Sequence, residues 1–230
     1  IAGIRIFSLH ELLDTGKEKE ALDVIRDIEN KFHFSMDSLA ASLKRMNSGS
    51  STNSPTVNID NLRIYIGLYL YLHESYQSEH KKEIKLFYDW TKKLLSVYGV
   101  GVAGMAEELS ILEAKCEVLN NNYDNAIAIL EENKIKSREP GYFLTLGRYY
   151  HHQKKYTEAE ENFNIMIKRS PINPKAHYYA ALLYYDWGKT EKADEYLNKS
   201  LGVWKNADEN YIFSNMAKAT AQKWGVEDIP

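Results

Sequence analysis

The chain has 230 residues, of which 44% are hydrophobic and 27% are charged, and this composition excludes disordered, collagen-like and low-complexity proteins. Its 29 basic and 32 acidic side chains give a net charge of -3, so neither nucleic acid nor an anionic membrane is expected as the main partner. No stretch reaches the roughly 20 apolar residues of a membrane span, so we expect a soluble protein.

The single cysteine, Cys116, excludes an intrachain disulfide and a thiolate-rich metal centre built from this chain alone. The thiol count does not identify the compartment. The glycosylation pattern Asn198-Lys199-Ser200 falls inside a predicted helix instead of a loop, which argues against eukaryotic secretion. The compartment is left unknown, and a soluble, cytoplasmic location is weakly favoured over a periplasmic or exported one.

Apolar residues recur three and four positions apart along most of the chain, and only five prolines interrupt it. The sequence therefore predicts an all-α fold. The predicted helices span 3–14, 17–32, 35–46, 59–76, 79–98, 104–120, 123–134, 141–153, 156–169, 174–187, 190–204 and 208–224. Short connections between them indicate antiparallel helical hairpins.

The hairpins repeat along the chain. Corresponding positions in the first helix of each pair recur at a constant step of 34 residues: Leu109, Leu112 and Cys116, then Phe143, Leu146 and Tyr150, then His177, Ala180 and Tyr184. The second helices repeat at steps of 33 and 34 residues, with Ala126 and Leu130, Ala159 and Phe163, and Ala193 and Leu197. This spacing is typical of a helix–turn–helix repeat protein.

The repeat resembles the tetratricopeptide repeat (TPR) family over residues 107–207. The family's pattern of aromatic, Leu-Gly, Tyr, Ala, Phe and Pro is matched by Phe143, Leu146, Gly147, Tyr150, Ala159, Phe163 and Pro171. The next repeat keeps Ala180, Ala181, Tyr184, Gly188, Ala193 and Leu197. The resemblance implies a right-handed α-solenoid of stacked antiparallel hairpins. The last predicted helix fits a capping role, because its apolar residues form one stripe: Phe213, Ala217, Thr220 and Trp224.

We divide the chain into five parts on this basis. They are an N-terminal helical segment with a partial repeat (1–46), a flexible polar loop (47–58), a divergent helical hairpin (59–105), the TPR-like repeats (106–207), and a capping helix with a tail (208–230).

Several short motifs resemble catalytic, cofactor or metal sites, but the residues around each motif do not fit such a site. Gly99–Gly104 spells a dinucleotide fingerprint but follows an amphipathic helix instead of a strand. His73-Glu74 lacks the second histidine of a zinc-protease helix, and the adjacent His151 and His152 point about 100° apart on a helix. We therefore predict no catalytic residue, no cofactor and no metal site.

The candidate site is instead a binding groove. In the TPR family the first helices of successive repeats line the concave surface. The resemblance implies that this surface contains Leu144, Arg148, His151, His152, Tyr178, Leu182 and Tyr185, with Asp186 nearby. Tyr, Arg and His often anchor protein interfaces, although the rings could also pack between repeats.

Some family members hold a partner's C-terminal carboxylate with Lys and Asn side chains. Lys175 fits one such position, but Arg148 and Leu182 stand where Asn is expected, and Tyr179 replaces a basic residue. We do not expect this mode of recognition.

The predicted function is a non-enzymatic scaffold or adaptor that binds a protein or peptide in an aromatic and basic groove. Two alternatives stay open at this point. The chain begins with Ile1 instead of Met, which is compatible with a regulatory or sensory module of a larger enzyme or transcription regulator. The second alternative is a scaffold that forms homo-oligomers through the Tyr-rich helices of 59–98.

Overall fold

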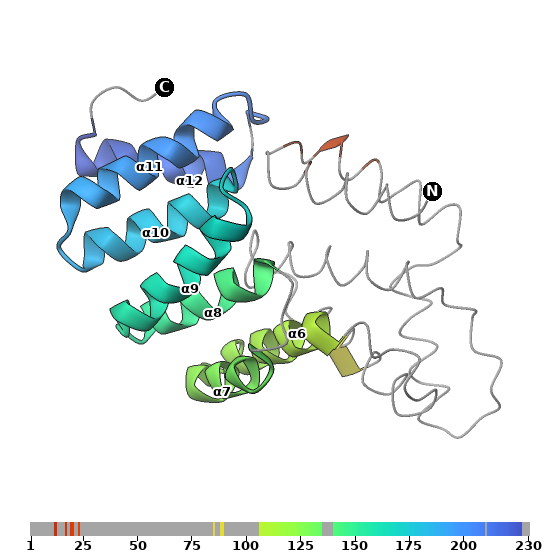
Figure 1. Cartoon of the computed structure of the whole chain (residues 1–230). Helices are drawn as coiled ribbons and strands as arrows, with labels where there is room; N and C mark the ends of the chain where they lie inside the picture. The colour runs from red at the N-terminus through yellow and green to blue at the C-terminus, as the bar shows by residue number, and fades with distance from the viewer. Residues whose placement is uncertain are drawn as a thin grey trace, which may run out of the picture. The chain divides into compact units, whose positions relative to one another are not determined.

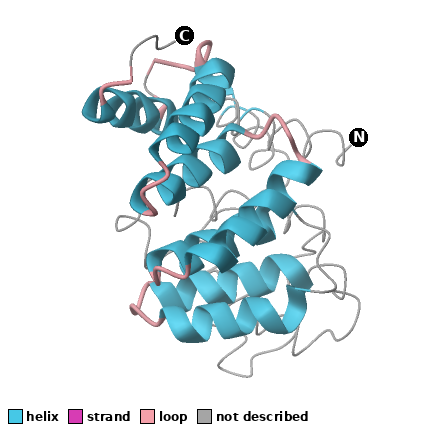
Figure 2. Cartoon of the chain, turned by 60° about the vertical axis from the view of Figure 1, so that its left-hand side comes forward, coloured by secondary structure: helices cyan, strands magenta, loops and turns pink. Residues whose placement is uncertain are grey.

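The computed structural model describes residues 12, 17, 19, 20, 23, 85, 88, 89, 106–134, 140–209 and 211–226. These residues form helices and turns, without a strand among them (Figures 1 and 2). The chain divides into two compact units, one of residues 1–7 and 22–129, the other of residues 8–21 and 130–230. The predicted elements between 3 and 105, including the loop 47–58 and the glycine-rich 99–104, lie outside the described residues apart from the single positions above.

Seven helices have assigned bounds within the described residues. They are α6 (Ala106–Val118), α7 (Tyr123–Asn133), α8 (Pro140–His152), α9 (Tyr156–Arg169), α10 (Pro174–Asp186), α11 (Thr190–Trp204) and α12 (Ile212–Trp224). From α6 to α11 each end lies within two residues of its predicted position. The predicted all-α class is confirmed.

The start of α12 corrects the prediction, which placed it at residue 208. The helix begins at Ile212 because the backbone first makes a turn, in which the Tyr211 amide donates to the Asp208 carbonyl at 2.9 Å. The Tyr211 ring is fully buried and meets the ring of Trp204 edge-on, with 6.0 Å between centroids. This packing fixes Tyr211 ahead of the helix.

The backbone itself repeats at the turn inside each hairpin. The amides of Asn122, Lys155 and Lys189 donate to the carbonyls of Glu117, Tyr150 and Tyr184, at 3.0, 2.9 and 2.8 Å. Each of these bonds spans a residue with positive φ: Asn121 at 60°, Lys154 at 59° and Gly188 at 77°. This is the hydrogen-bonding pattern of a Schellman-type helix end. The equivalent residues are 33 and 34 positions apart, so the repeat deduced from side chains is also present in the backbone.

In the second unit, α8 packs on α9, α9 on α10, α10 on α11, and α11 on α12 (Figure 1). Small residues allow the helices of a hairpin to approach closely. A Cβ atom added at Gly147 of α8 would lie only 2.6 Å from Cε1 of Phe163 on α9. Ala159, Ala181 and Ala193 are likewise fully buried, as expected from their place in the repeat pattern.

The outer helix has one apolar and one polar face. Phe213, Ala217 and Ala221 of α12 are fully buried, whereas Lys218 and Gln222 are exposed. A helix of this kind ends a stack of repeats, because it covers the last apolar surface without presenting a new one.

Candidate functional site

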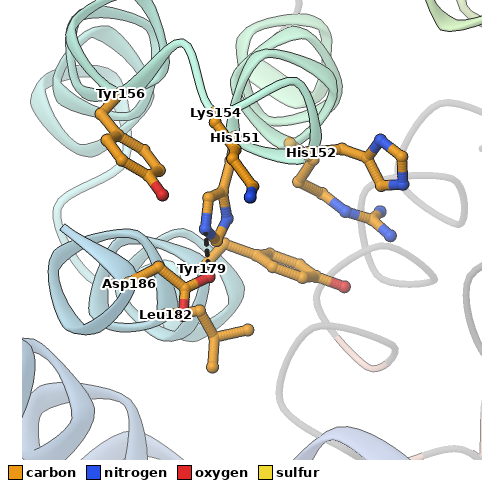
Figure 3. A pocket seen from close by; sticks show the side chains of 8 residues that line it. His151, His152, Lys154, Tyr156, Tyr179, Leu182 and Asp186 are labelled. Carbon is orange, nitrogen blue, oxygen red and sulfur yellow. Dashed lines mark hydrogen bonds and ion pairs between the residues drawn. The ribbon is translucent and has the colours of Figure 1, made fainter.

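A pocket of about 550 Å³ in the second unit is the candidate binding site (Figure 3). It is lined by residues of α8 and α10, the first helices of two successive repeats, and by residues at the start of α9 and the turn before it. The lining residues are Arg148, His151, His152, Lys154, Tyr156, Tyr179, Leu182 and Asp186. The volume is in the range of sites that hold small ligands or a few side chains of a peptide.

Helical periodicity explains why these side chains converge. Arg148, His151 and His152 are three and four positions apart on α8, and therefore share one face. On α10, Tyr179, Leu182 and Asp186 follow the same spacing. The two faces meet because α8 also contacts α10 directly.

Two contacts link the two helices across the pocket. The Nε2 atom of His151 lies 2.9 Å from Oδ2 of Asp186, and because a carboxylate only accepts, the imidazole donates (Figure 3). The guanidinium carbon of Arg148 lies 4.3 Å from the centre of the Tyr179 ring, which is a cation–π distance. These contacts hold side chains of both repeats in fixed positions.

The lining residue Tyr156 has aromatic neighbours both inside the pocket and beyond its lining. The Tyr156 ring lies 6.2 Å from His151 and 5.7 Å from Trp187, measured between centroids. The ammonium of Lys189 lies 3.1 Å from the centre of the Trp187 ring. The site thus combines apolar area with cationic and hydrogen-bonding groups.

Four of the seven predicted partner-binding residues line the pocket, namely Arg148, His151, His152 and Leu182. Leu144 and Tyr178 are buried, with exposed fractions of 6% and 3%. The Tyr178 ring lies 6.1 Å from that of Trp204, and its hydroxyl is 3.3 Å from Oγ1 of Thr220 on α12. Both residues are therefore in contact with the core and outside the pocket.

Tyr185, the seventh predicted residue, is 39% exposed and does not line the pocket. Its ring stacks on that of Trp224 in α12, with 4.1 Å between centroids and 3° between planes. This stack joins α10 to the capping helix.

Sequence reasoning missed three residues of the pocket: Lys154, Tyr156 and Tyr179. Tyr179 could have been found, since it is three positions before Leu182 and shares its face, but the prediction places its neighbour Tyr178 on the groove surface instead. Lys154 occupies the turn position that is Gly188 in the next repeat, and its side chain cannot be placed from helical spacing.

Three other potentially reactive side chains of the described residues, Cys116, Tyr150 and Tyr184, have raised pKa values. Burial, and carboxylates around it, raise the pKa of Cys116 to about 12, so the thiol stays protonated at neutral pH. Burial raises the pKa of Tyr150 and of Tyr184, and the Glu131 and Glu160 carboxylates that accept from their hydroxyls add to the effect. Within the described part of the chain, no cluster of three His, Cys, Asp or Glu side chains could hold a metal ion.

Two family models match this chain. The model described as anaphase-promoting complex, cyclosome, subunit 3 covers residues 102–166, and the model described as tetratricopeptide repeat covers residues 174–203. A search of curated proteins finds no match. The chain therefore carries tetratricopeptide repeats in this region, as its resemblance to the family indicated. Such repeats are generally non-enzymatic and suggest a protein-interaction scaffold.

Two further expectations concern membrane-spanning helices and the helices of 59–98. None of the helices among the described residues is long and apolar enough to cross a membrane. The helices of 59–98 considered for homo-oligomerisation lie outside the described residues, except for positions 85, 88 and 89.

Proposed function

We propose that this chain is a non-enzymatic scaffold or adaptor that binds a segment of a partner protein in the pocket between α8 and α10. The observation that carries the proposal is the convergence of Arg148, His151 and Tyr179 from two successive repeats on one open site. The match to a family named for a subunit of a multiprotein complex supports a role in assembly.

The side chains of the pocket suit a protein partner. Arg and Tyr are enriched among residues that dominate binding energy, because they combine a large contact area with groups that form hydrogen bonds. Leu182 adds an apolar surface between Tyr179 and Asp186. The His151–Asp186 and Arg148–Tyr179 contacts position the lining before a partner arrives, which lowers the entropy lost on binding.

Capture of partners with a pocket variant and a matched control tests the proposal. The pocket variant carries Arg148→Ala and His152→Ala. The control carries Met216→Ala and Lys218→Ala, two exposed positions of α12. The control should melt close to the wild type, since surface changes usually alter stability by no more than about 0.5 kcal/mol. The pocket variant also loses the Arg148–Tyr179 contact, so its free energy of unfolding should fall by about 0.5–1 kcal/mol while it stays folded.

The affinity of each captured protein is then measured by titration against all three forms. We expect wild type and control to bind with equal affinity and the pocket variant to bind at least about tenfold more weakly, because anchor residues contribute about 2 kcal/mol or more. Equal binding by the folded pocket variant would place the partner on another surface.

A further inference from the structure

Trp187 occupies a position at which the repeat does not need a large side chain. It directly precedes the left-handed Gly188, and the equivalent residues of the two preceding hairpins, Asn120 and Gln153, are polar. Its backbone is helical, with a φ of -83° and a ψ of -2°, and its amide donates to the Leu183 carbonyl at 3.0 Å. Since the same turn forms with asparagine or glutamine at this position, the repeat pattern does not explain the indole ring.

The ring of Trp187 contacts both the pocket lining and a charged pair outside the lining. Its centroid lies 5.7 Å from that of Tyr156, with 32° between the planes. The Tyr156 ring points toward His151, and 6.2 Å separate the two ring centroids (Figure 3). Outside the lining, the ammonium of Lys189 lies 3.1 Å from the centre of the Trp187 ring and 3.9 Å from Oε1 of Glu160. A continuous line of contacts therefore runs from α9 to the imidazole in the pocket.

Hydrogen bonds to Tyr184 fix the outer end of this line. Tyr184 is only 3% exposed, and its hydroxyl donates to Oε1 of Glu160 at 3.0 Å. Its carbonyl accepts from the Lys189 amide at 2.8 Å, in the turn of the hairpin. The Tyr156 and Trp187 side chains are only half-buried, so the position of each ring depends on the groups beside it. Loss of the indole would therefore release the Tyr156 ring.

We propose that Trp187 is a positioning residue of the pocket, which holds the Tyr156 ring against the His151 imidazole before a partner binds. The inference rests on the proposed function and adds to the site a residue from outside its lining. Side chains that are already fixed lose less conformational entropy when a partner immobilises them, so the indole raises the affinity without touching the partner.

An NMR experiment on the unbound full chain tests this positioning directly. Histidines labelled with ¹³C at Cε1 give one signal for each of the seven histidines, and the signal of His151 is the one that disappears in His151→Gln. Trp187→Gln introduces the residue found at the same place in the preceding hairpin, so the turn should still form. We expect the His151 signal to shift, because the displaced Tyr156 ring no longer exerts its ring current on the imidazole. Trp187→Phe keeps a ring and should restore most of the wild-type position.

Trp224→Gln is the matched control for a purely structural effect. Trp224 also stacks on a tyrosine, Tyr185, and neither residue lines the pocket. This variant loses a similar aromatic contact and should melt at a similarly lowered temperature, but its His151 signal should stay at the wild-type position. If Trp187→Gln does not fold, Trp187→Leu replaces it, because leucine keeps apolar bulk without a ring.

Two further measurements follow the effect through Tyr156 and to the partner. In a Tyr156→Leu background, Trp187→Gln should cause no additional shift of the His151 signal, because the indole acts through that ring. Titration with the captured partner should show Trp187→Gln binding on the order of two- to tenfold more weakly than wild type, and Trp224→Gln binding equally well.

The contrary results separate this inference from the proposed function. An unshifted His151 signal in Trp187→Gln, or the same shift in Trp224→Gln, would overturn the inference. Full partner affinity of Trp187→Gln would also overturn it if the Arg148→Ala, His152→Ala variant loses affinity, and the proposed function would then survive. Full affinity of that pocket variant would instead refute the proposed function, and the His151 signal alone would then decide whether Trp187 positions the lining.

Discussion

The close approach of α8 and α9 predicts the outcome of replacing Gly147 with alanine. The added Cβ would lie 2.6 Å from Cε1 and 2.7 Å from Cδ1 of Phe163. Real carbon contacts do not fall so far below 3 Å, so either the ring or a helix must move. Phe163 is only 1% exposed, and its ring has little space into which to turn.

Two opposing effects set the magnitude. Alanine is a better helix former than glycine by about 1 kcal/mol. Overpacking a close contact costs about 1–3 kcal/mol. Gly202 in α11 isolates the first effect, because it is exposed and a Cβ there would meet nothing within 4 Å. We therefore expect Gly202→Ala to raise the free energy of unfolding by about 0.5–1 kcal/mol, and Gly147→Ala to lower it by up to about 2 kcal/mol.

Urea denaturation followed by circular dichroism measures both changes, and a double-mutant cycle assigns the cause. Phe163→Leu removes the clashing ring edge, so Gly147→Ala should cost less in that background, with a coupling of at least about 1 kcal/mol. If Gly147→Ala stabilised the protein as much as Gly202→Ala, the helices would not approach as closely at this point as the structure requires.

Three further changes test other parts of the fold. Ala159→Leu and Ala193→Leu, at fully buried positions, should each lower the free energy of unfolding by about 1–3 kcal/mol, and unchanged melting curves would contradict the repeat register. Lys154→Gly should raise the free energy of unfolding by up to about 1 kcal/mol, because it removes a lysine from a left-handed backbone conformation. A lower free energy of unfolding would refute strain at this residue. Burial holds the pKa of His177 below its ordinary value, although the hydrogen bond between its ring and the Pro171 carbonyl opposes this shift. The free energy of unfolding should therefore fall as the pH drops below about 6.5, because the unfolded chain takes up the proton first. His177→Gln should flatten that pH dependence, and an unchanged slope would assign it to other groups.

The repeats were predictable from sequence because their packing depends on residue size at fixed spacing. Gly147 and Phe163 meet in a close contact between α8 and α9, and Ala159 is fully buried on α9, so few residue sizes fit at each of these positions. The period of the repeat and the size of the side chains at each position therefore predict the bounds of the helices from α6 to α11. The start of α12 was not predictable in this way, since it depends on the burial of Tyr211 against Trp204 at the end of α11, a contact between elements that the spacing within one helix does not reveal.

The pocket was predictable only in part. Residues on a helical face follow from spacing, which is why Arg148, His151 and Leu182 were identified. In a doublet such as Tyr178-Tyr179, either ring could be buried in the core or lie at the surface. Only the helices packed against each ring determine which position it takes. Tyr178 meets Trp204 and α12, whereas Tyr179 meets Arg148. Contacts with α12 and α8 thus decide which of the two rings of α10 is in the core and which lines the pocket, a choice that the repeat pattern does not make.

Site-specific photo-crosslinking tests the central claim, that a partner binds in the pocket between α8 and α10. A photoreactive amino acid replaces Leu182 in the pocket or, as a control, Val203, which is 36% exposed on α11. Each form is irradiated together with the captured partner. We predict a crosslinked product from position 182 and none from position 203. Crosslinking from position 203 alone would show that the partner occupies a different surface.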